Sequence, residues 1–229
     1  MKKLVALLFV SVFTLNLNAQ IDEDKVGAWY MYFFSHSKKD KVLGFQGDVQ
    51  FRNWNMGGDL EQLLLRGGLT IKPKNSIAKY TLGYGNITTG DYGSGTATNM
   101  EHRIYQEMLY PVKVGNRFYT SNRFRFEQRI RENQDLRTRF RYNLFVNIPL
   151  NNTEIVAKTF YLAFYNELFI NGQKSVGNGN FVELFDRNRL YSGVGYKIND
   201  GMKVQLAFMN QTTNSWAKNQ MQFSFHHNF

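Results

Sequence analysis

The chain has 229 residues, of which 43% are hydrophobic and 16% aromatic, a length that fits one large domain or two small ones. It contains no cysteine, which excludes disulfide bonds as a source of stability. The formal net charge of +10 raises nucleic acid, lipopolysaccharide and small anions as classes of partner.

The N-terminus has the organisation of an export signal. Residues 1–19, MKKLVALLFVSVFTLNLNA, join two lysines to an apolar run and a small final residue, which predicts a secretory signal peptide cleaved after Ala19. No cysteine follows, so a lipoprotein anchor is excluded. Without Lys2 and Lys3 the mature chain, residues 20–229, keeps 26 basic and 18 acidic residues, a net charge of +8. An exported protein of this charge favours lipopolysaccharide phosphates, acidic polysaccharides or small anions over nucleic acid.

The rest of the chain divides into short alternating segments. The longest later apolar run, AWYMYFF at 28–34, is far shorter than the roughly 20 residues of a membrane helix. Membrane strands leave no such run, because their apolar and polar residues alternate. Segments of this kind cover 26–36, 42–54, 61–71, 76–87, 102–112, 121–145, 156–170, 187–197, 202–210 and 220–229.

The segment 121–145, SNRFRFEQRIRENQDLRTRFRYNLF, is the most regular. Its seven arginines all have odd numbers, and the even positions between them include Phe124, Phe126, Phe140 and Tyr142. A helix would scatter these arginines around its axis, whereas a strand places them all on one face. With ENQDL as the turn, the stretch predicts a hairpin that has one basic face and one apolar face. The arginines are Arg123, Arg125, Arg129, Arg131, Arg137, Arg139 and Arg141.

The connections predict which ends of the strands lie together. PKN, KVGN, LNNTE and NDG alternate along the chain with glycine-rich loops near 88–100 and 171–181. Short periplasmic turns opposite longer extracellular loops are typical of an all-β, antiparallel, up-and-down barrel in the outer membrane. We count eleven segments, with 121–145 as two, whereas bacterial barrels have an even number of strands; ten and twelve are both open, and we favour twelve. Phe223, Phe225 and Phe229 resemble the C-terminal signal read by the barrel assembly machinery.

A soluble β-sandwich or a lipocalin-like barrel is the alternative interpretation of a period of two. In such a protein the apolar faces would point inward and the arginines would cover the outside as a dense layer of guanidinium groups. The C-terminal aromatic residue and the difference between the two sets of connections would then be coincidences.

Several motifs carry a resemblance to a known family. HRIYQE (102–107), RFRFEQR (123–129), RTRFRYNLF (137–145), YNELFING (165–172) and FDRNRLYSGVGY (185–196) are similar to the family called domain of unknown function 2490. The resemblance covers nearly the whole mature chain and implies an outer-membrane barrel of a Gram-negative bacterium. It implies no catalytic residues, because the family label carries no activity.

If the apolar faces meet lipid, the polar faces line the lumen. If residues are assigned to the two faces by their alternation along each strand, fifteen cations share the lumen with four anions, Asp48, Glu107, Glu127 and Glu167. Unpaired buried charge costs several kcal/mol per ion. We therefore expect an interior that is wet, holds anions, or places much of its charge at the rims. The cations are Arg52, Arg66, Lys79, Arg103, Arg123, Arg125, Arg129, Arg131, Arg137, Arg139, Arg141, Arg187, Arg189, Lys197 and Lys203.

Three interpretations of this basic face stay open. The arginines and glutamates can form a structural ladder that fills the interior. Alternatively, Arg103, Arg123, Arg125, Arg139, Arg141, Arg187 and Arg189, with the three glutamates, can line a narrow channel or binding barrel for a small anionic solute. As a third possibility, Arg129, Arg131 and Arg137 can hold lipopolysaccharide phosphates at the outer rim.

Enzyme signals are weak. Ser224 and His226 share a strand face near the expected periplasmic end, but nothing in the sequence shows a base held in place by a third group. No histidine stands in a metal-binding spacing such as HExxH, and TGDYGSG does not lie between a strand and a helix, as a phosphate-binding loop would. We predict no enzyme activity, no cofactor, no metal and no nucleic-acid partner.

Overall fold

The computed structural model describes residues 21, 23–37, 41–93 and 95–229, so the predicted signal peptide lies outside the described residues. Within them the chain forms eleven strands and no helix. It therefore has no helix there that is long and apolar enough to cross a bilayer. The strands are β1 (Gly27–Ser37), β2 (Leu43–Asn55), β3 (Gly58–Ile71), β4 (Lys79–Gly90), β5 (Thr98–Val114), β6 (Phe118–Arg131), β7 (Arg137–Pro149), β8 (Thr159–Asn171), β9 (Phe185–Lys197), β10 (Met202–Thr212) and β11 (Ala217–Asn228).

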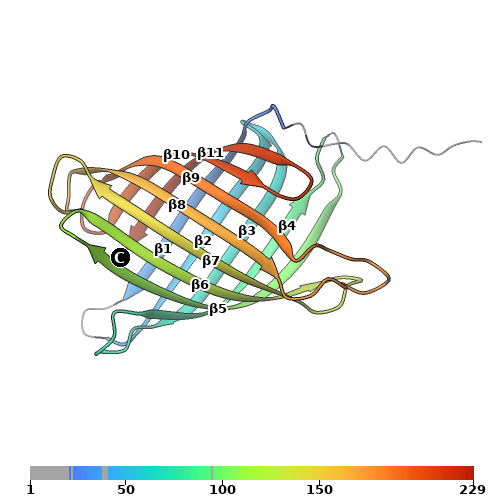
Figure 1. Cartoon of the computed structure of the whole chain (residues 1–229), viewed down its shortest axis with the longest axis horizontal. Coiled ribbons are helices and arrows are strands. Elements are labelled where there is room, and N and C mark those ends of the chain that lie inside the picture. Colours follow the sequence, from blue (N-terminus) through green and yellow to red (C-terminus); the bar gives the residue numbers. More distant parts are fainter. Residues whose placement is uncertain (1–20, 22, 38–40, 94) are drawn as a thin grey trace, which may run out of the picture.

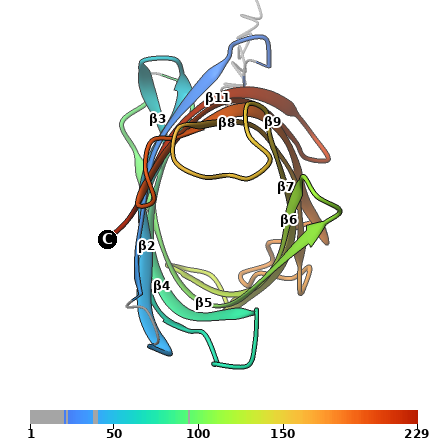
Figure 2. The same cartoon turned by 90° about the vertical axis from the view of Figure 1, so that its left-hand side faces the viewer.

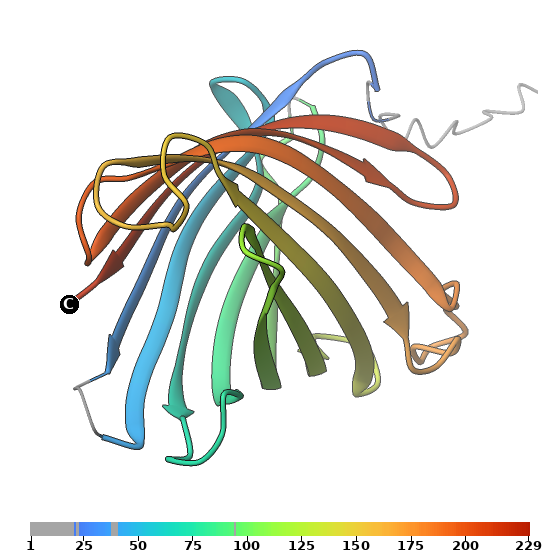
Figure 3. The same ribbon diagram turned by 60° about the vertical axis from the view of Figure 1, so that its left-hand side comes forward.

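The eleven strands close into one barrel, with the strands inclined to its axis (Figure 1, Figure 3). Consecutive strands pair antiparallel, but β1 closes the ring against β11 in parallel, from Gly27 opposite Gln220 to Ser35 opposite Asn228. The preference for twelve strands is therefore not confirmed, and the sheet is mixed instead of purely antiparallel. A parallel seam lets an odd number of strands satisfy both edges, so closure needs no further strand.

Because β1 and β11 run the same way, both end at one rim, which we call the carboxyl rim; the other is the amino rim. PKN, KVGN, LNNTE and NDG all lie at the carboxyl rim, and both glycine-rich loops lie at the amino rim, as predicted. The difference in length is small. The first glycine-rich loop shortens to 91–97, because Gly90 pairs with Thr98 and the strands extend. Among the connections at the amino rim, 172–184 is the longest, and the carboxyl-rim connection 150–158 is longer than 91–97.

The side chains alternate between the two faces of the sheet. Phe124, Phe140 and Tyr142 are 46%, 54% and 37% exposed on the outside, whereas Arg125 and Arg139 beside them are 7% and 3% exposed. The period of two predicted from the sequence for 121–145 is therefore present in β6 and β7, which pair around the turn 132–136. The soluble alternative, with buried rings and exposed arginines, does not match this arrangement.

Two inward tyrosines lie flat over glycines of the neighbouring strand. A Cβ atom built on Gly83 would approach Cζ of Tyr105 to 2.2 Å, and one on Gly195 would approach Cζ of Tyr161 to 2.1 Å. Glycine therefore leaves the space that each ring occupies on the inner wall. Tyr161 belongs to the apolar core cluster, which lies on the inner side of β1, β8, β9 and β10.

Candidate functional site

The interior of the barrel holds a network of ion pairs around three glutamates. Glu127 accepts hydrogen bonds from Nη2 of Arg139 and Nη1 of Arg141, both at 2.6 Å. Glu107 accepts from Nε of Arg125 at 2.7 Å. All of these side chains are buried. Each carboxylate in such a network offsets the desolvation of the guanidinium groups around it.

Glu167 links the third side of this network. Its Oε1 accepts from Nη2 of Arg141 at 2.5 Å and from Nη2 of Arg123 at 2.7 Å. Nη1 of Arg189 lies 3.9 Å from its other oxygen. Arg189 is held mainly by Gln211, whose Oε1 accepts from its Nε at 2.7 Å. The network thus joins β5, β6, β7, β8 and β9 across the lumen.

Toward the amino rim, further acids that the parity argument missed extend the network. Glu101 pairs with Arg129 at 2.7 Å and also with Arg103. Asp186 pairs with Nη1 of Arg139 at 2.6 Å and with Arg187 at 3.3 Å. Glu61, Glu101 and Asp186 raise the number of interior acids from the four expected to seven, which is still fewer than the fifteen cations expected there.

Two of these acids point inward because of β-bulges. Arg52 pairs with Gln62 but Asn53 pairs with Leu60, so Glu61 is an extra residue in β3. Phe169 pairs with Arg187 but Ile170 pairs with Phe185, so Asp186 is an extra residue in β9. A bulge shifts the alternation of side chains and aims the extra one inward. Glu61 then accepts a 2.7 Å hydrogen bond from Nε1 of Trp29.

Aromatic rings support guanidinium groups that have few carboxylate partners. The Cζ atoms of Arg52 and Arg189 lie 3.8 and 4.8 Å from the ring centre of Trp29. Arg52 also donates to Gln50 and Gln62, at 2.6 and 3.0 Å, and has no carboxylate within ion-pair distance among the described residues. These contacts stabilise a buried cation without neutralising it.

A cavity of about 700 Å³ occupies the half of the barrel that opens at the carboxyl rim. Its lining includes nine arginines and lysines but only four acids, Asp48, Glu107, Glu167 and Asp200, an excess of five positive charges. Arg103, Arg129, Arg139 and Arg187 are absent from the lining. The cavity therefore ends at the ion-pair network and does not continue to the amino rim. The nine cations are Arg52, Arg66, Lys79, Arg123, Arg125, Arg141, Arg189, Lys197 and Lys203.

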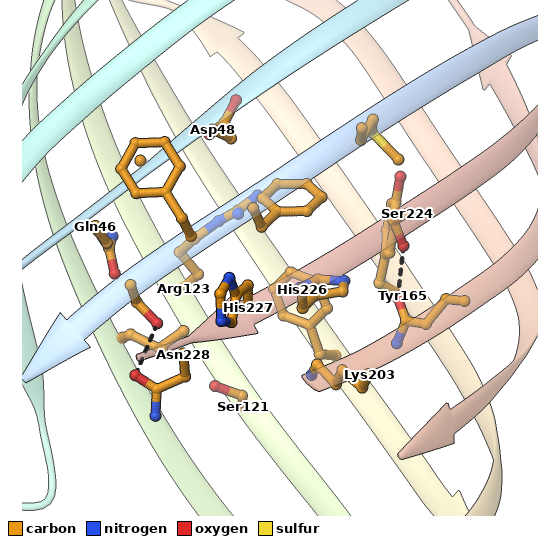
Figure 4. A pocket seen from close by; sticks show the side chains of 18 of the residues that line it. Gln46, Asp48, Ser121, Arg123, Tyr165, Lys203, Ser224, His226, His227 and Asn228 are labelled. Carbon is orange, nitrogen blue, oxygen red and sulfur yellow. Dashed lines mark hydrogen bonds between the residues drawn. The ribbon is translucent and has the colours of Figure 1, made fainter. Parts of the chain in front are cut away.

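The cations without acidic partners in the cavity are mostly lysines, not the arginines that dominate the sequence pattern. Nζ of Lys79 donates to the neutral Oε1 of Gln46 at 2.6 Å and has no carboxylate within ion-pair distance among the described residues. Nζ of Lys203 has no side-chain hydrogen bond or ion pair to any described residue. Figure 4 shows Lys203 beside His226 at this end of the cavity. Two of the cations without a carboxylate partner, Lys79 and Lys203, therefore lie near the open end of the cavity.

The structure places some of the arginines predicted for the rim inside the barrel, and only some of those predicted for the lumen line the cavity. Arg129 and Arg137 are both buried, and they bind Glu101 and Gln134. Arg131 is half-buried at the amino rim. Binding of lipopolysaccharide by these three arginines stays a prediction. Among the lumen candidates, Arg123, Arg125, Arg141 and Arg189 line the cavity, whereas Arg103, Arg139 and Arg187 lie outside its lining, toward the amino rim.

The C-terminal aromatics lie on the outside of the seam strand. Phe223 and Phe225 stack on Tyr30 and Tyr32 of β1, with ring centres 5.4 and 5.7 Å apart. Phe229 is 54% exposed at the carboxyl rim. These positions leave the rings accessible on the outer surface, and their recognition by the assembly machinery stays a prediction.

Ser224 and His226 do not form a hydrogen-bonded pair. Oγ of Ser224 donates to Oε1 of Gln205 at 3.4 Å, and the ring of His226 stacks on Phe33 at 4.7 Å. Nε2 of His226 is buried without a partner. Among the described residues, no group of three or more histidine, aspartate or glutamate side chains is placed to hold a metal ion.

Comparison with known proteins agrees with the resemblance carried by the motifs. An uncharacterized protein of Methylorubrum extorquens is 27% identical over 180 residues, which cover 76% of this chain and 74% of the relative. The model of the family described as "Protein of unknown function (DUF2490)" matches residues 26–222. That match spans ten strands completely and the first half of β11. The chain therefore belongs to the DUF2490 family.

Proposed function

We propose that this protein is an outer-membrane β-barrel that binds a small anionic solute in the cavity at its carboxyl rim. The observation that carries the proposal is the excess of five positive charges in a cavity with one open end. A low-dielectric wall concentrates the field of such charges on a bound anion. The same charges would be costly without an anionic occupant or water.

The location in the outer membrane rests on the outer surface of the barrel and on both ends of the chain. Large apolar side chains such as Leu69, Leu82 and Leu190 are 60–69% exposed on the outside. Residues 1–19 have the pattern of a signal peptide. A C-terminal strand that ends in an aromatic residue at the periplasmic side would orient the carboxyl rim, and the cavity, toward the periplasm.

A binding barrel is favoured over a narrow channel because of the buried ion pairs. Glu127 is 1% exposed and Arg139 is 3% exposed, in the half of the lumen that the cavity does not reach. An ion would have to break this network to pass. The second candidate, a structural or surface-interaction barrel without a solute, is favoured by the same pairing, since a filled lumen stabilises the fold on its own.

Calorimetric titration in lipid nanodiscs with succinate and inorganic phosphate separates these two functions. We expect saturable binding that Lys79→Gln and Lys203→Gln each weaken by about tenfold, because a charge-assisted hydrogen bond contributes roughly 1.5–3 kcal/mol. Neither substitution leaves a bonded carboxylate without its partner. Lys174→Gln, at an exposed site on the amino-rim connection, is the matched control and should bind as the wild type does.

Planar-bilayer recording tests the remaining alternative of a channel. We expect no steady stepwise conductance from the wild-type barrel. An anion-selective conductance would restore the channel interpretation. Titrations in which neither anion binds, together with a silent bilayer, would instead favour the structural barrel.

A further inference from the structure

The wall of the cavity is divided into a charged side and an apolar side. The paired arginines and acids project from β2 to β8, apart from Arg189 on β9. The core cluster lies on β1, β8, β9 and β10. The residues of this cluster and of its packing partners that line the cavity are Trp29, Met31, Ile155, Ala163, Tyr165 and Tyr191. We call these six residues the apolar wall. A site for a hydrophilic anion alone has no use for such a surface.

A row of basic side chains stands above the apolar wall at the carboxyl rim. Lys197 and Lys203 are direct register partners on β9 and β10, and His226 is the partner of Lys203 on β11. Like charges placed opposite each other in a sheet are destabilising. The acid bonded to Lys197 is Asp200, 3.4 Å away and 95% exposed in its side chain. This row is therefore a place where a bound anion would relieve repulsion.

The connection 150–158 extends the apolar wall to the open end of the cavity at the carboxyl rim. Figure 2 shows the connection between β7 and β8 reaching across part of the opening. Ile155 of this connection packs against the core cluster, and its carbonyl oxygen accepts a 3.2 Å hydrogen bond from Nζ of Lys197. The basic row and the apolar wall thus meet on β9, which carries both Lys197 and Tyr191.

We infer that the ligand is an amphipathic anion, with a carboxylate or phosphate head at Lys197 and Lys203 and an acyl chain along the apolar wall. This inference rests on the proposed function and adds the chemical class of the solute. On β9, Tyr191 lies six positions from Lys197, roughly 20 Å at about 3.3 Å per strand residue, and both residues line the cavity, which gives room for a medium-length chain. The cavity of about 700 Å³ has the size of sites for such small molecules.

The two ends of the ligand contribute in different ways. The head gains charge-assisted hydrogen bonds from lysines that have no buried acid beside them. Each methylene removed from water adds about 0.8 kcal/mol, close to fourfold in affinity. Affinity should therefore rise along the series hexanoate, octanoate and decanoate, and decanol should bind poorly because it has no charge.

The test uses a decanoate that carries bromine on its last carbon, because bromine quenches tryptophan on contact. Trp29 lies at the inner end of the apolar wall, whereas Trp54 and Trp216 contact each other near the amino rim, with ring centres 6.3 Å apart. A full-length barrel with Trp54→Phe and Trp216→Phe, in lipid nanodiscs, leaves Trp29 as the reporter. We expect saturable quenching by bromodecanoate and by the matching bromodecyl phosphate, and their ratio tells which head is preferred.

Two substitutions with matched controls separate the head from the chain. Lys203→Gln should weaken bromodecanoate binding about tenfold, and Lys174→Gln should not change it. Met31→Gln, which puts a polar group on the apolar wall, should weaken it about fivefold, and Met56→Gln, at an exposed site in the β2–β3 turn, should not. Both cavity substitutions keep the ion-pair network intact, and the heat-modified gel mobility of each variant reports that it has folded.

The outcomes distinguish this inference from the proposed function. If bromodecanol quenches Trp29 as well as bromodecanoate does, the head group plays no part and the inference is overturned. If succinate and phosphate bind but bromodecanoate does not quench, the amphipathic ligand is excluded and the anion-binding barrel stands. If neither succinate, phosphate nor bromodecanoate binds, both proposals fail.

Discussion

The central ion pairs allow a sharp prediction about stability. Glu127 is 1% exposed and accepts hydrogen bonds from Nε and Nη2 of Arg139, at 2.9 and 2.6 Å, and from Nη1 of Arg141 at 2.6 Å. Glu127→Gln keeps the size of this side chain but removes its charge. The two guanidinium groups then share less negative charge inside the barrel.

The structure sets the expected magnitude of this loss. Breaking one partner of a buried ion pair costs about 3–5 kcal/mol. Arg139 would still contact Asp186 at 2.6 Å, and Arg141 would still contact Glu167 at 2.5 Å. Because both cations keep a carboxylate, we expect the lower end of that range, about 3 kcal/mol less free energy of unfolding.

Urea unfolding in phospholipid vesicles, followed by tryptophan fluorescence, measures this change. Glu183→Gln is the control, since Glu183 and its partner Lys174 are 67% and 60% exposed in their side chains and such pairs contribute little. The double variant Glu127→Gln/Arg139→Gln should lose less than the sum of the two single variants. A loss below about 1 kcal/mol for Glu127→Gln, the range of exposed pairs, would refute the view that the network is dry and stabilising.

Two further predictions follow from the packing of the lumen. Gly83→Ala should destabilise the barrel by roughly 1–3 kcal/mol, because the new methyl group overlaps the ring of Tyr105, whereas Gly67→Ala, with open space around it, should not; the same urea unfolding measures both. The double truncation Glu127→Ala/Arg139→Ala should give the barrel a steady conductance in planar bilayers, and a silent bilayer would show that other side chains suffice to close the lumen.

Much of the fold could be predicted from the sequence because alternation is a local signal. The odd-numbered arginines of 121–145 and the ENQDL turn predicted the β6–β7 hairpin, and the turn sequences predicted which rims they share. The strand pairing that closes the barrel could not be predicted in this way. Pairing between β1 and β11 joins residues almost 200 positions apart, and no short pattern states whether that seam is parallel.

The candidate site was harder to predict for a related reason. Glu61 and Asp186 point inward only because a bulge shifts the alternation, so parity assigned them to the wrong face or overlooked them. The arginine-rich pattern also led to candidate binding residues whose charge is neutralised by carboxylates in the structure. Lys203, whose side chain has no hydrogen bond or ion pair to the described residues, lies near the start of an ordinary strand, and its role can be inferred only when its surroundings are known.

The account depends most on which face of the sheet meets lipid, and two adjacent residues of β10 test it directly. Leu206 is 49% exposed on the outside, whereas Gln205 lines the cavity. Each is replaced by cysteine and labelled with a fluorophore, in bilayers that contain brominated lipid. We predict that the label at position 206 is quenched by the lipid and that the label at position 205 is quenched only by a water-soluble quencher. The reverse pattern, or equal quenching by water at both positions, would contradict the membrane barrel and the cavity proposed inside it.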